Sequence, residues 1–220
     1  ASRTPQLAEQ VAVSVRTFDA ETLRATPAAT LDGALRSVPG SSLFRRSDSF
    51  SANPTAQGVS LRGLGPSGAS RSLVLLDGVP LNDPESHGVF WVNTPDLTSS
   101  LASVQIQRGV GTSTVGTGAF GGSVSLETAA PSGKRQKTFI GTGSWPLGYR
   151  GTYLWEGPWV GRHKNLAFSG RVTHQSANGY VDRSGMDLHS AVLNGIWRYG
   201  ATAATGRQGS IRFFYTDGQE

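Results

Sequence analysis

Length, composition and charge already exclude several classes of protein. The chain has 220 residues with 29 glycines and only 16% charged residues, unlike the Leu-, Glu- and Lys-rich composition of a helical bundle. It has no cysteine, which excludes a disulfide framework, a thiolate metal site and a cysteine nucleophile. The net charge is +5, but the charges are scattered, which is typical of a solvated surface, and we expect no nucleic-acid partner.

One helix is predicted near the start of the chain. Thr26 is expected to be its N-cap and Pro27 its first helical position. Leu31 and Leu35 lie four residues apart and give the helix an apolar stripe, and the sequence 38–40 (Val-Pro-Gly) ends it.

Short strands make up most of the remaining first 130 residues, with a second short helix expected from Pro95. Helices and strands therefore alternate, which predicts a small α/β or α+β domain. Two long polar loops, 41–57 and 82–94, interrupt it, and loops of this length in a compact domain are usually functional or disordered. The predicted strands are 11–15, 58–62, 72–77, 103–108 and 123–128.

The composition changes at residues 131–136, after which all but one of the tryptophans and tyrosines occur. Apolar and polar residues alternate there, which predicts an antiparallel sheet with one wet face. The aromatic residues suit a membrane-interface girdle, although a soluble β-sandwich alternates in the same way, and periodicity leaves both open. The expected strands are 137–145, 149–157, 165–175, 191–199 and 208–216, separated by turns such as Asn178-Gly179.

A membrane location is compatible with the hydropathy of the chain. No run of 18 apolar residues occurs, so we expect no transmembrane helix, but β-strands that span a bilayer need only about 9–11 residues. The chain begins Ala1-Ser2-Arg3, and we expect any export signal to have been removed or omitted. Five strands cannot close a membrane barrel, so under the barrel interpretation this chain is part of a larger assembly.

Motifs for catalysis or cofactor binding are weak. The pattern G-x-G-x-x-G occurs at 63–68 and 116–121, but each copy leads into a strand, whereas a dinucleotide site needs a helix there. The four histidines stand far apart in sequence without ligand spacing, and no Ser/His/Asp set is evident. We therefore predict no enzyme activity, no catalytic residue, no metal site and no cofactor.

Five segments are more specific when taken together than any one motif, namely 31–40, 59–63, 73–82, 104–109 and 118–124. Their order and spacing closely resemble the plug domain of TonB-dependent outer-membrane receptors, and the segment 178–183 resembles the start of that family's barrel. The resemblance implies an α+β plug domain at 1–130, then an antiparallel transmembrane β-barrel at 131–220, with about five strands of a 22-stranded type.

The resemblance also implies roles for individual residues. Arg62 and Arg108 end plug strands and correspond to plug arginines that bind carboxylates of the barrel wall. Loops 41–57 and 82–94 match the outward plug loops, whose side chains either contact ligand, line the wet gap beside the barrel or pack on the plug core. The candidate ligand residues are Arg45, Arg46, Ser49, Gln57, Glu85, His87, Phe90, Trp91 and Asn93.

The family imports scarce nutrients across the Gram-negative outer membrane, and the resemblance implies the same here. The expected ligand is a small molecule, most often a ferric siderophore or other iron complex; cobalamin, sugar or peptide uptake and a signalling receptor are alternatives. The expected partners are outer-membrane lipid and the inner-membrane TonB complex, which would act through a TonB box upstream of Ala1. The remaining barrel strands would come from the rest of the polypeptide or from a second chain.

Overall fold

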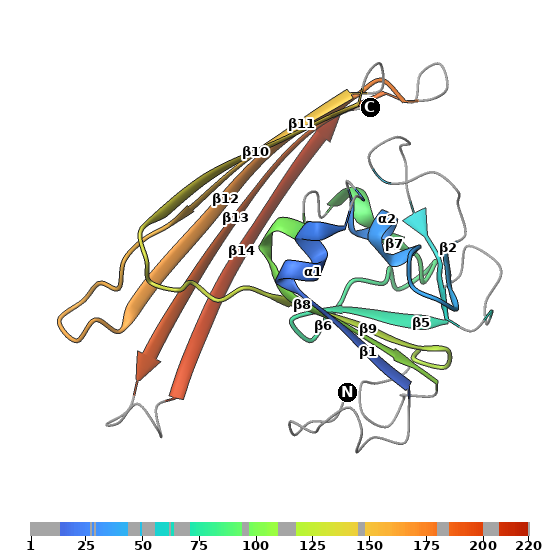
Figure 1. Ribbon diagram of the computed structural model, residues 1–220, viewed down its shortest axis with the longest axis horizontal. Coiled ribbons are helices and arrows are strands. Elements are labelled where there is room, and N and C mark those ends of the chain that lie inside the picture. The colour runs from blue at the N-terminus through green and yellow to red at the C-terminus, as the bar shows by residue number, and fades with distance from the viewer. Residues whose placement is uncertain are drawn as a thin grey trace. The chain divides into compact units, whose positions relative to one another are not determined.

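The chain divides into two compact units, Ala1–Ala129 and Ala130–Glu220 (Figure 1). None of the helices among the described residues is long and apolar enough to cross a membrane. The computed structural model describes residues 14–26, 28, 30–43, 49, 56–61, 63, 71–93, 97–109, 118–144, 148–179, 185–199 and 207–219.

A five-stranded mixed sheet forms the centre of the first unit. Its order is β1-β8-β9-β5-β6, in which β5 and β9 run parallel and the other neighbours run antiparallel. Two small antiparallel pairs, β2 with β4 and β3 with β7, stand beside it. The strands are β1 Ser14–Asp19, β2 Ser41–Leu43, β3 Ala56–Gln57, β4 Val59–Leu61, β5 Ser72–Leu76, β6 Val79–Pro80, β7 Val89–Phe90, β8 Leu101–Arg108 and β9 Gly122–Thr128.

Two short helices replace the single predicted one, α1 (Ala20–Ala25) and α2 (Leu31–Leu35). The predicted N-cap at Thr26 is wrong, because the Thr26 amide donates to the Leu23 carbonyl and so ends α1. The cap of α2 is Thr30, whose hydroxyl accepts the Gly33 amide at 3.2 Å. The predicted stripe is confirmed, since Leu31 and Leu35 are both buried. Pro27 lies outside the described residues.

Short 3₁₀ helices precede β8, namely η2 (Trp91–Asn93) and η3 (Leu97–Ser100). In place of the helix expected from Pro95, the described residues of this segment form one 3₁₀ turn, η3. It leads directly into Leu101, two residues before the predicted start of the strand.

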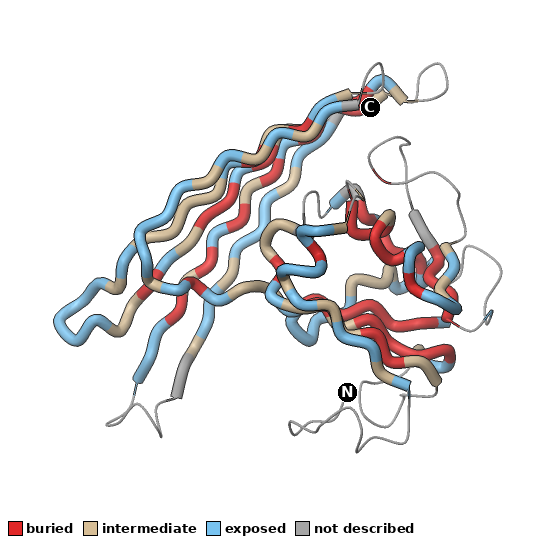
Figure 2. The backbone as a smooth tube through the Cα atoms, in the orientation of Figure 1, coloured by how far each residue is buried: buried red, intermediate tan, exposed pale blue. Residues whose placement is uncertain are grey.

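The hydrophobic core of the first unit lies on both faces of β5. All five residues of this strand are buried, which is typical of a central strand covered on each side. Val74 and Leu76 join the main cluster with Ile106 and Val124, and Leu73 and Leu75 pack with Ala119. Figure 2 shows this buried backbone along the sheet.

The second unit is an antiparallel meander in which each strand pairs with the next along the chain. The five predicted strands are all present. The largest difference from the predicted bounds is at β13, which begins at Met186 rather than at 191, while the other strand ends differ by three residues or fewer. Ala177 pairs with Met186, so the connection 178–185 is longer than a tight Asn-Gly turn. The strands are β10 Gln136–Ser144, β11 Gly148–Glu156, β12 Leu166–Ala177, β13 Met186–Tyr199 and β14 Arg207–Gln219.

The two faces of this meander differ in chemistry. Directly paired residues share a face, so one row of the sheet reads Phe139, Tyr153, Val172, Ala191 and Tyr215, and the adjacent row on the other face reads Ile140, Thr152, Thr173, Ser190 and Thr216. We call the first the aromatic face and the second the polar face. Exposed and buried positions alternate along the middle strands in Figure 2, which confirms the predicted period of two.

Candidate functional site

The two polar loops predicted from the sequence meet in the first unit. Strand β3 lies at the end of the first loop and β7 lies within the second, and the two pair antiparallel. Ala56 is opposite Phe90 and Gln57 is opposite Val89. Segments more than 30 residues apart in the sequence are therefore held side by side, although the side chain of Gln57 is outside the described part of the structure.

Asn82 fastens the start of the second loop to the central sheet. Its side-chain oxygen accepts the Val74 amide at 2.7 Å, and its amide nitrogen donates to the carbonyls of Ser72 at 3.2 Å and His87 at 3.0 Å. The Asn82 side chain thus forms hydrogen bonds with backbone groups both on β5 and at the other end of the turn 83–87. This fixes where the loop leaves the sheet.

Asp83 organises the tip of the same loop. Its Oδ1 accepts the Ser86 amide at 2.7 Å, the Ser86 hydroxyl at 2.8 Å and the Glu85 amide at 3.2 Å. These bonds favour the ionised form, so the pKa of Asp83 is lowered, first by the Ser86 amide and then by its hydroxyl. His87 takes a positive φ of 56° as the chain turns back, and its amide donates to the Asp83 carbonyl at 2.8 Å.

Four predicted ligand residues present exposed side chains on this loop. Glu85 and His87 lie at the tip, Phe90 is 37% exposed on β7, and Asn93 is exposed in η2. Because Asn82 and Asp83 hold the backbone, these groups stand on an ordered turn. It offers an acid, an imidazole, an aromatic ring and an amide.

Two other predicted ligand residues have internal partners. Trp91 is only 2% exposed and belongs to the main hydrophobic cluster, in keeping with packing on the core. Ser49 is buried, and its amide and hydroxyl donate to the carboxylate of Asp32 at 2.9 and 2.7 Å. Asp32 is itself fully buried in α2, and no local sequence pattern indicates that it connects this loop to the helix.

Of the two arginines predicted to bind carboxylates of the barrel wall, the structure describes only Arg108. Arg108, at the end of β8, donates from its Nη1 to the Pro39 carbonyl at 3.0 Å and so supports the turn after α2. Arg62, Arg45 and Arg46 lie outside the described residues, and the roles predicted for them stay predictions.

The segment entering the first strand of the second unit is held by side chains of that unit. The amide and hydroxyl of Ser132 donate to the Glu156 carboxylate, and the Trp159 indole donates to the Ser132 carbonyl at 3.2 Å. The Arg198 guanidinium lies 4.0 Å from the centre of the Trp159 ring. These contacts hold Ser132 in place, four residues before β10 begins at Gln136.

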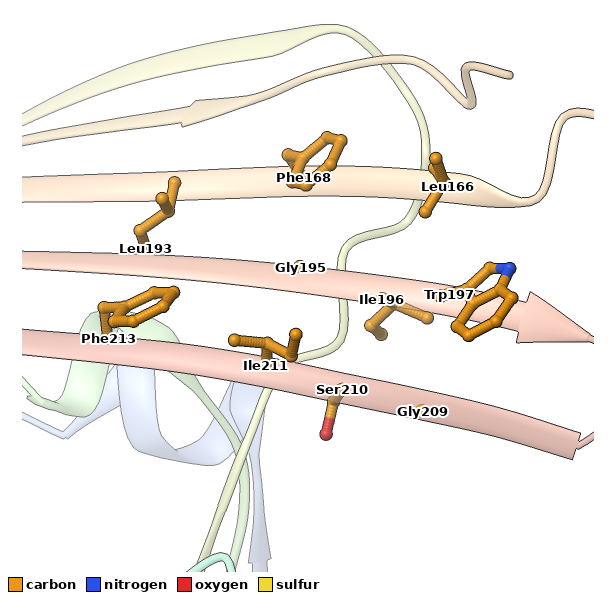
Figure 3. Close-up of a pocket in the computed structure, with 10 residues that line it drawn as sticks. All are labelled: Leu166, Phe168, Leu193, Gly195, Ile196, Trp197, Gly209, Ser210, Ile211 and Phe213. Carbon is orange, nitrogen blue, oxygen red and sulfur yellow. The ribbon is translucent and has the colours of Figure 1, made fainter.

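A hollow of about 250 Å³ lies on strands β12, β13 and β14. Figure 3 shows Phe168, Leu193 and Phe213 projecting from neighbouring strands, with Gly195 between them. Gly195 leaves room for the Phe168 ring, since a Cβ there would lie 3.2 Å from it. The lining is almost entirely carbon, which suits acyl chains rather than a polar ligand.

The strand register of the second unit brings two histidines together. His174 and His189 are far apart in the chain, yet the register pairs them directly across β12 and β13, with their Nδ1 atoms 3.3 Å apart. Sequence spacing cannot show such a pair, because it depends on which strands pair and in what register.

A model of the TonB-dependent Receptor Plug Domain family matches residues 8–123. The chain belongs to this family. The comparison with curated proteins gives no match. The matched residues include strands β1 to β8 and the start of β9, so the family match covers most of the mixed sheet with its helices and loops.

Solved receptors share the fold of the plug and of the strands that follow it. The ferric yersiniabactin uptake receptor FyuA from Yersinia pestis is 21% identical with a TM-score of 0.63, over 84% of this chain and 29% of that one. The siderophore receptor PirA from Pseudomonas aeruginosa is 20% identical with a TM-score of 0.60, over 92% and 35%. The pyoverdine receptor FpvA from Pseudomonas aeruginosa PAO1 is 17% identical with a TM-score of 0.68, over 96% and 28%.

These comparisons confirm the fold class, an α+β plug domain followed by antiparallel strands of a partial transmembrane β-barrel. The chain spans about a third or less of the length of these receptors. The family is one of receptors and transporters rather than of enzymes.

Proposed function

We propose that this plug domain and its barrel strands belong to an outer-membrane receptor that takes up a ferric siderophore with energy from the TonB complex. The observation that carries the proposal is a family-matched plug followed at once by a meander with one aromatic and one polar face. Solved structures with this fold include a ferric yersiniabactin uptake receptor and a pyoverdine outer membrane receptor, which supports an iron complex as the cargo.

The two faces of the meander support a place in the outer membrane. Strands in a bilayer must satisfy all backbone groups by pairing and turn apolar side chains to lipid. The aromatic face meets this requirement with exposed rings such as Phe139, Phe168 and Phe213. The polar face, with Thr173 and Asn194, suits a wet lumen around a plug.

The domain arrangement follows from the same proposal. Residues 1–130 would form the plug within the barrel, and residues 131–220 would begin its wall, with further strands from the same polypeptide or a second chain. Arg62 and Arg108 would then bind wall carboxylates. The donation from Arg108 to the Pro39 carbonyl uses Nη1, and the remaining guanidinium nitrogens carry further donors for such a pair.

Ligand would bind at the joined loops. Glu85, His87, Phe90 and Asn93 are exposed there, and β3–β7 pairing brings the end of the first loop to the same edge. The first loop also contains Arg45 and Arg46, which lie outside the described residues and would add a basic pair to the site. A basic pair beside an aromatic ring suits an anionic, partly aromatic ligand such as a ferric catecholate. Gln57 is at the paired edge, while Ser49 and Trp91 would support the loops from within.

Transport would need no bond-making step. TonB would pull on a short TonB box in the N-terminal region, and the plug would rearrange so that ligand passes, driven by the proton gradient. The chain therefore needs no catalytic residue and no cofactor for this function.

A growth assay tests the proposal. A strain that lacks the gene is grown with single iron sources, each a different ferric siderophore, and is then complemented with the gene in a background with or without TonB. We expect the gene to restore growth on at least one ferric siderophore only when TonB is present. Rescue by cobalamin, a sugar or a peptide alone would replace the proposed cargo, and no TonB-dependent rescue on any of these sources would contradict transport.

A further inference from the structure

One end of the aromatic face carries a cluster of metal-ligand side chains. His174 in β12 lies directly opposite His189 in β13, and Asp187 precedes His189 by two residues and so points to the same face. The cluster lies where β12 ends and β13 begins, next to the connection 178–185. Three potential ligands from two strands therefore share one small area.

The ligand atoms have the spacing of a bound ion. His174 Nδ1 lies 3.3 Å from His189 Nδ1 and 3.4 Å from Asp187 Oδ1, and one ligand atom from each residue can be chosen so that all lie within 4.8 Å. Tetrahedral zinc with ligands at about 2.0–2.1 Å places neighbouring ligand atoms about 3.3–3.4 Å apart. The His174 distances thus match those of a shared ion. The two imidazole rings are stacked with their centroids 4.6 Å apart, so ion binding requires them to turn until one nitrogen of each faces the ion. Nε2 of His189 already lies 3.5 Å from Asp187 Oδ1.

Tyr149 is placed to orient His174. Its phenol oxygen lies 3.1 Å from His174 Nε2, on the side of the ring away from the cluster. When Nε2–H donates to that oxygen, Nδ1 keeps its lone pair toward His189 and Asp187. Ligating histidines commonly donate their other nitrogen in this way, which fixes the tautomer and the ring.

Charge and access favour a cation here. Asp187 brings one carboxylate, and Asp217 of β14 is paired with His189 on the same face and brings a second. The three ligand side chains are half-exposed, so an ion and a completing water can enter. The row with Val172, Ala191 and Tyr215 lies further along the strands, so the cluster stands at the polar border of the apolar band.

We propose that His174, His189 and Asp187 bind one divalent transition-metal ion, with zinc as the best-matched ion and water completing the tetrahedron. The ion would join the ends of β12 and β13 beside the connection 178–185. The site is independent of the proposed uptake function, since none of these residues belongs to the plug loops.

Zinc titration of the purified protein in detergent, stripped of metal beforehand, tests the site. We expect one Zn²⁺ per chain by calorimetry and a visible Co²⁺ spectrum typical of tetrahedral nitrogen and oxygen ligands. Replacing the orienting group with Tyr149→Phe is expected to weaken binding about tenfold, and His174→Ala or His189→Ala by more than that.

The chain offers matched controls in its other two histidines. His163→Ala, in the turn 161–164 of the same unit, and His87→Ala, in the plug loop, should leave the affinity and the Co²⁺ spectrum unchanged. Asp187→Asn is a second test that keeps the shape of the side chain, should an alanine variant fold poorly. It removes the proposed carboxylate ligand and is expected to weaken Zn²⁺ binding. The proposal is overturned if the wild-type protein takes up no Zn²⁺, if the double variant His174→Ala/His189→Ala binds as the wild type does, or if His163→Ala or His87→Ala removes binding.

Discussion

At the scale of single residues, Asp83 shows how one carboxylate orders a candidate ligand loop. Its pKa is lowered from the ordinary value of 3.8 because the Ser86 amide and hydroxyl donate to the ionised form. A carboxyl group whose pKa is lower in the folded state than in the unfolded state stabilises the folded turn at any pH above its unfolded-state pKa. This contribution is lost as the pH falls through the folded-state pKa. The turn should therefore hold at neutral pH and loosen only in strong acid.

The pH dependence of the Ser86 amide measures this effect. We expect its NMR chemical shift to titrate with a midpoint below 3.8, because the proton that neutralises Asp83 removes the charge-assisted bond. Asp83→Asn is the control and should abolish this titration. A midpoint at or above 3.8 in the wild type would show that the turn does not favour the ionised carboxylate.

Several single residues were predictable and others were not. Leu31 and Leu35 are buried as their spacing indicates, because a helical stripe is a local property. Trp91 packs in the core instead of facing the loop solvent, and Ser49 binds Asp32 within the fold. The His174–His189 pair depends on strand register, which no local pattern contains.

At the scale of elements, the pairing of β8 with β9 requires glycine where β9 begins. Gly122 has a φ of 135°, and a Cβ there would lie 2.1 Å from the Gln107 carbonyl oxygen. We expect Gly122→Ala to separate these strands and to lower the yield of folded protein severely. The new Cβ would collide with the backbone of Gln107 and Arg108, which the pairing of β8 holds in place.

Gly78→Ala is the matched control for this prediction. Gly78 also has a positive φ, 85°, in the two-residue turn between β5 and β6, but a Cβ there meets nothing within 4 Å. Its cost should be only the conformational strain, about 1–2 kcal/mol. Hydrogen exchange of the β8 and β9 amides compares the two variants. Equal protection in both would mean that the close approach at Gly122 is unimportant.

The two faces of β14 give a second prediction at this scale. Phe213 and Phe214 are neighbours, and both are exposed, but Phe213 lies on the aromatic face and Phe214 on the polar face. Arginine in a lipid-facing midplane position costs about 2–4 kcal/mol, whereas lumen-facing positions tolerate charge. We expect Phe213→Arg, expressed from the natural gene, to reduce the amount in the outer membrane far more than Phe214→Arg. Equal loss would contradict the assigned faces.

Element types were more predictable than their boundaries. The five barrel strands follow from strict alternation, since a sheet with two unlike faces imposes a period of two. The start of β13 at Met186 was missed because residues 186–190 place histidine and aspartate on the aromatic face and so break the apolar pattern. In the plug, α1 was missed although Asp19 caps it by accepting the Thr22 amide at 2.8 Å, since six residues are too few for a clear stripe.

At the scale of the whole molecule, order along the chain was the decisive signal. Each plug segment is weak alone, but five in sequence indicate the family, and the family match to residues 8–123 bears this out. The ligand site was less predictable, because loops 41–57 and 82–94 have no periodic pattern. Their meeting depends on the tertiary pairing of β3 with β7.

The function that we propose for this plug and its strands is energy-driven uptake across the outer membrane. The most direct measurement is the uptake of radiolabelled iron, supplied as the ferric siderophore that supports growth, by cells with and without the gene, before and after the proton gradient is collapsed. We predict gene-dependent accumulation that stops when the gradient is lost, while binding of the siderophore to the cell surface persists. Accumulation that is unchanged after the collapse, or equal in cells without the gene, would contradict energy-driven uptake by this receptor.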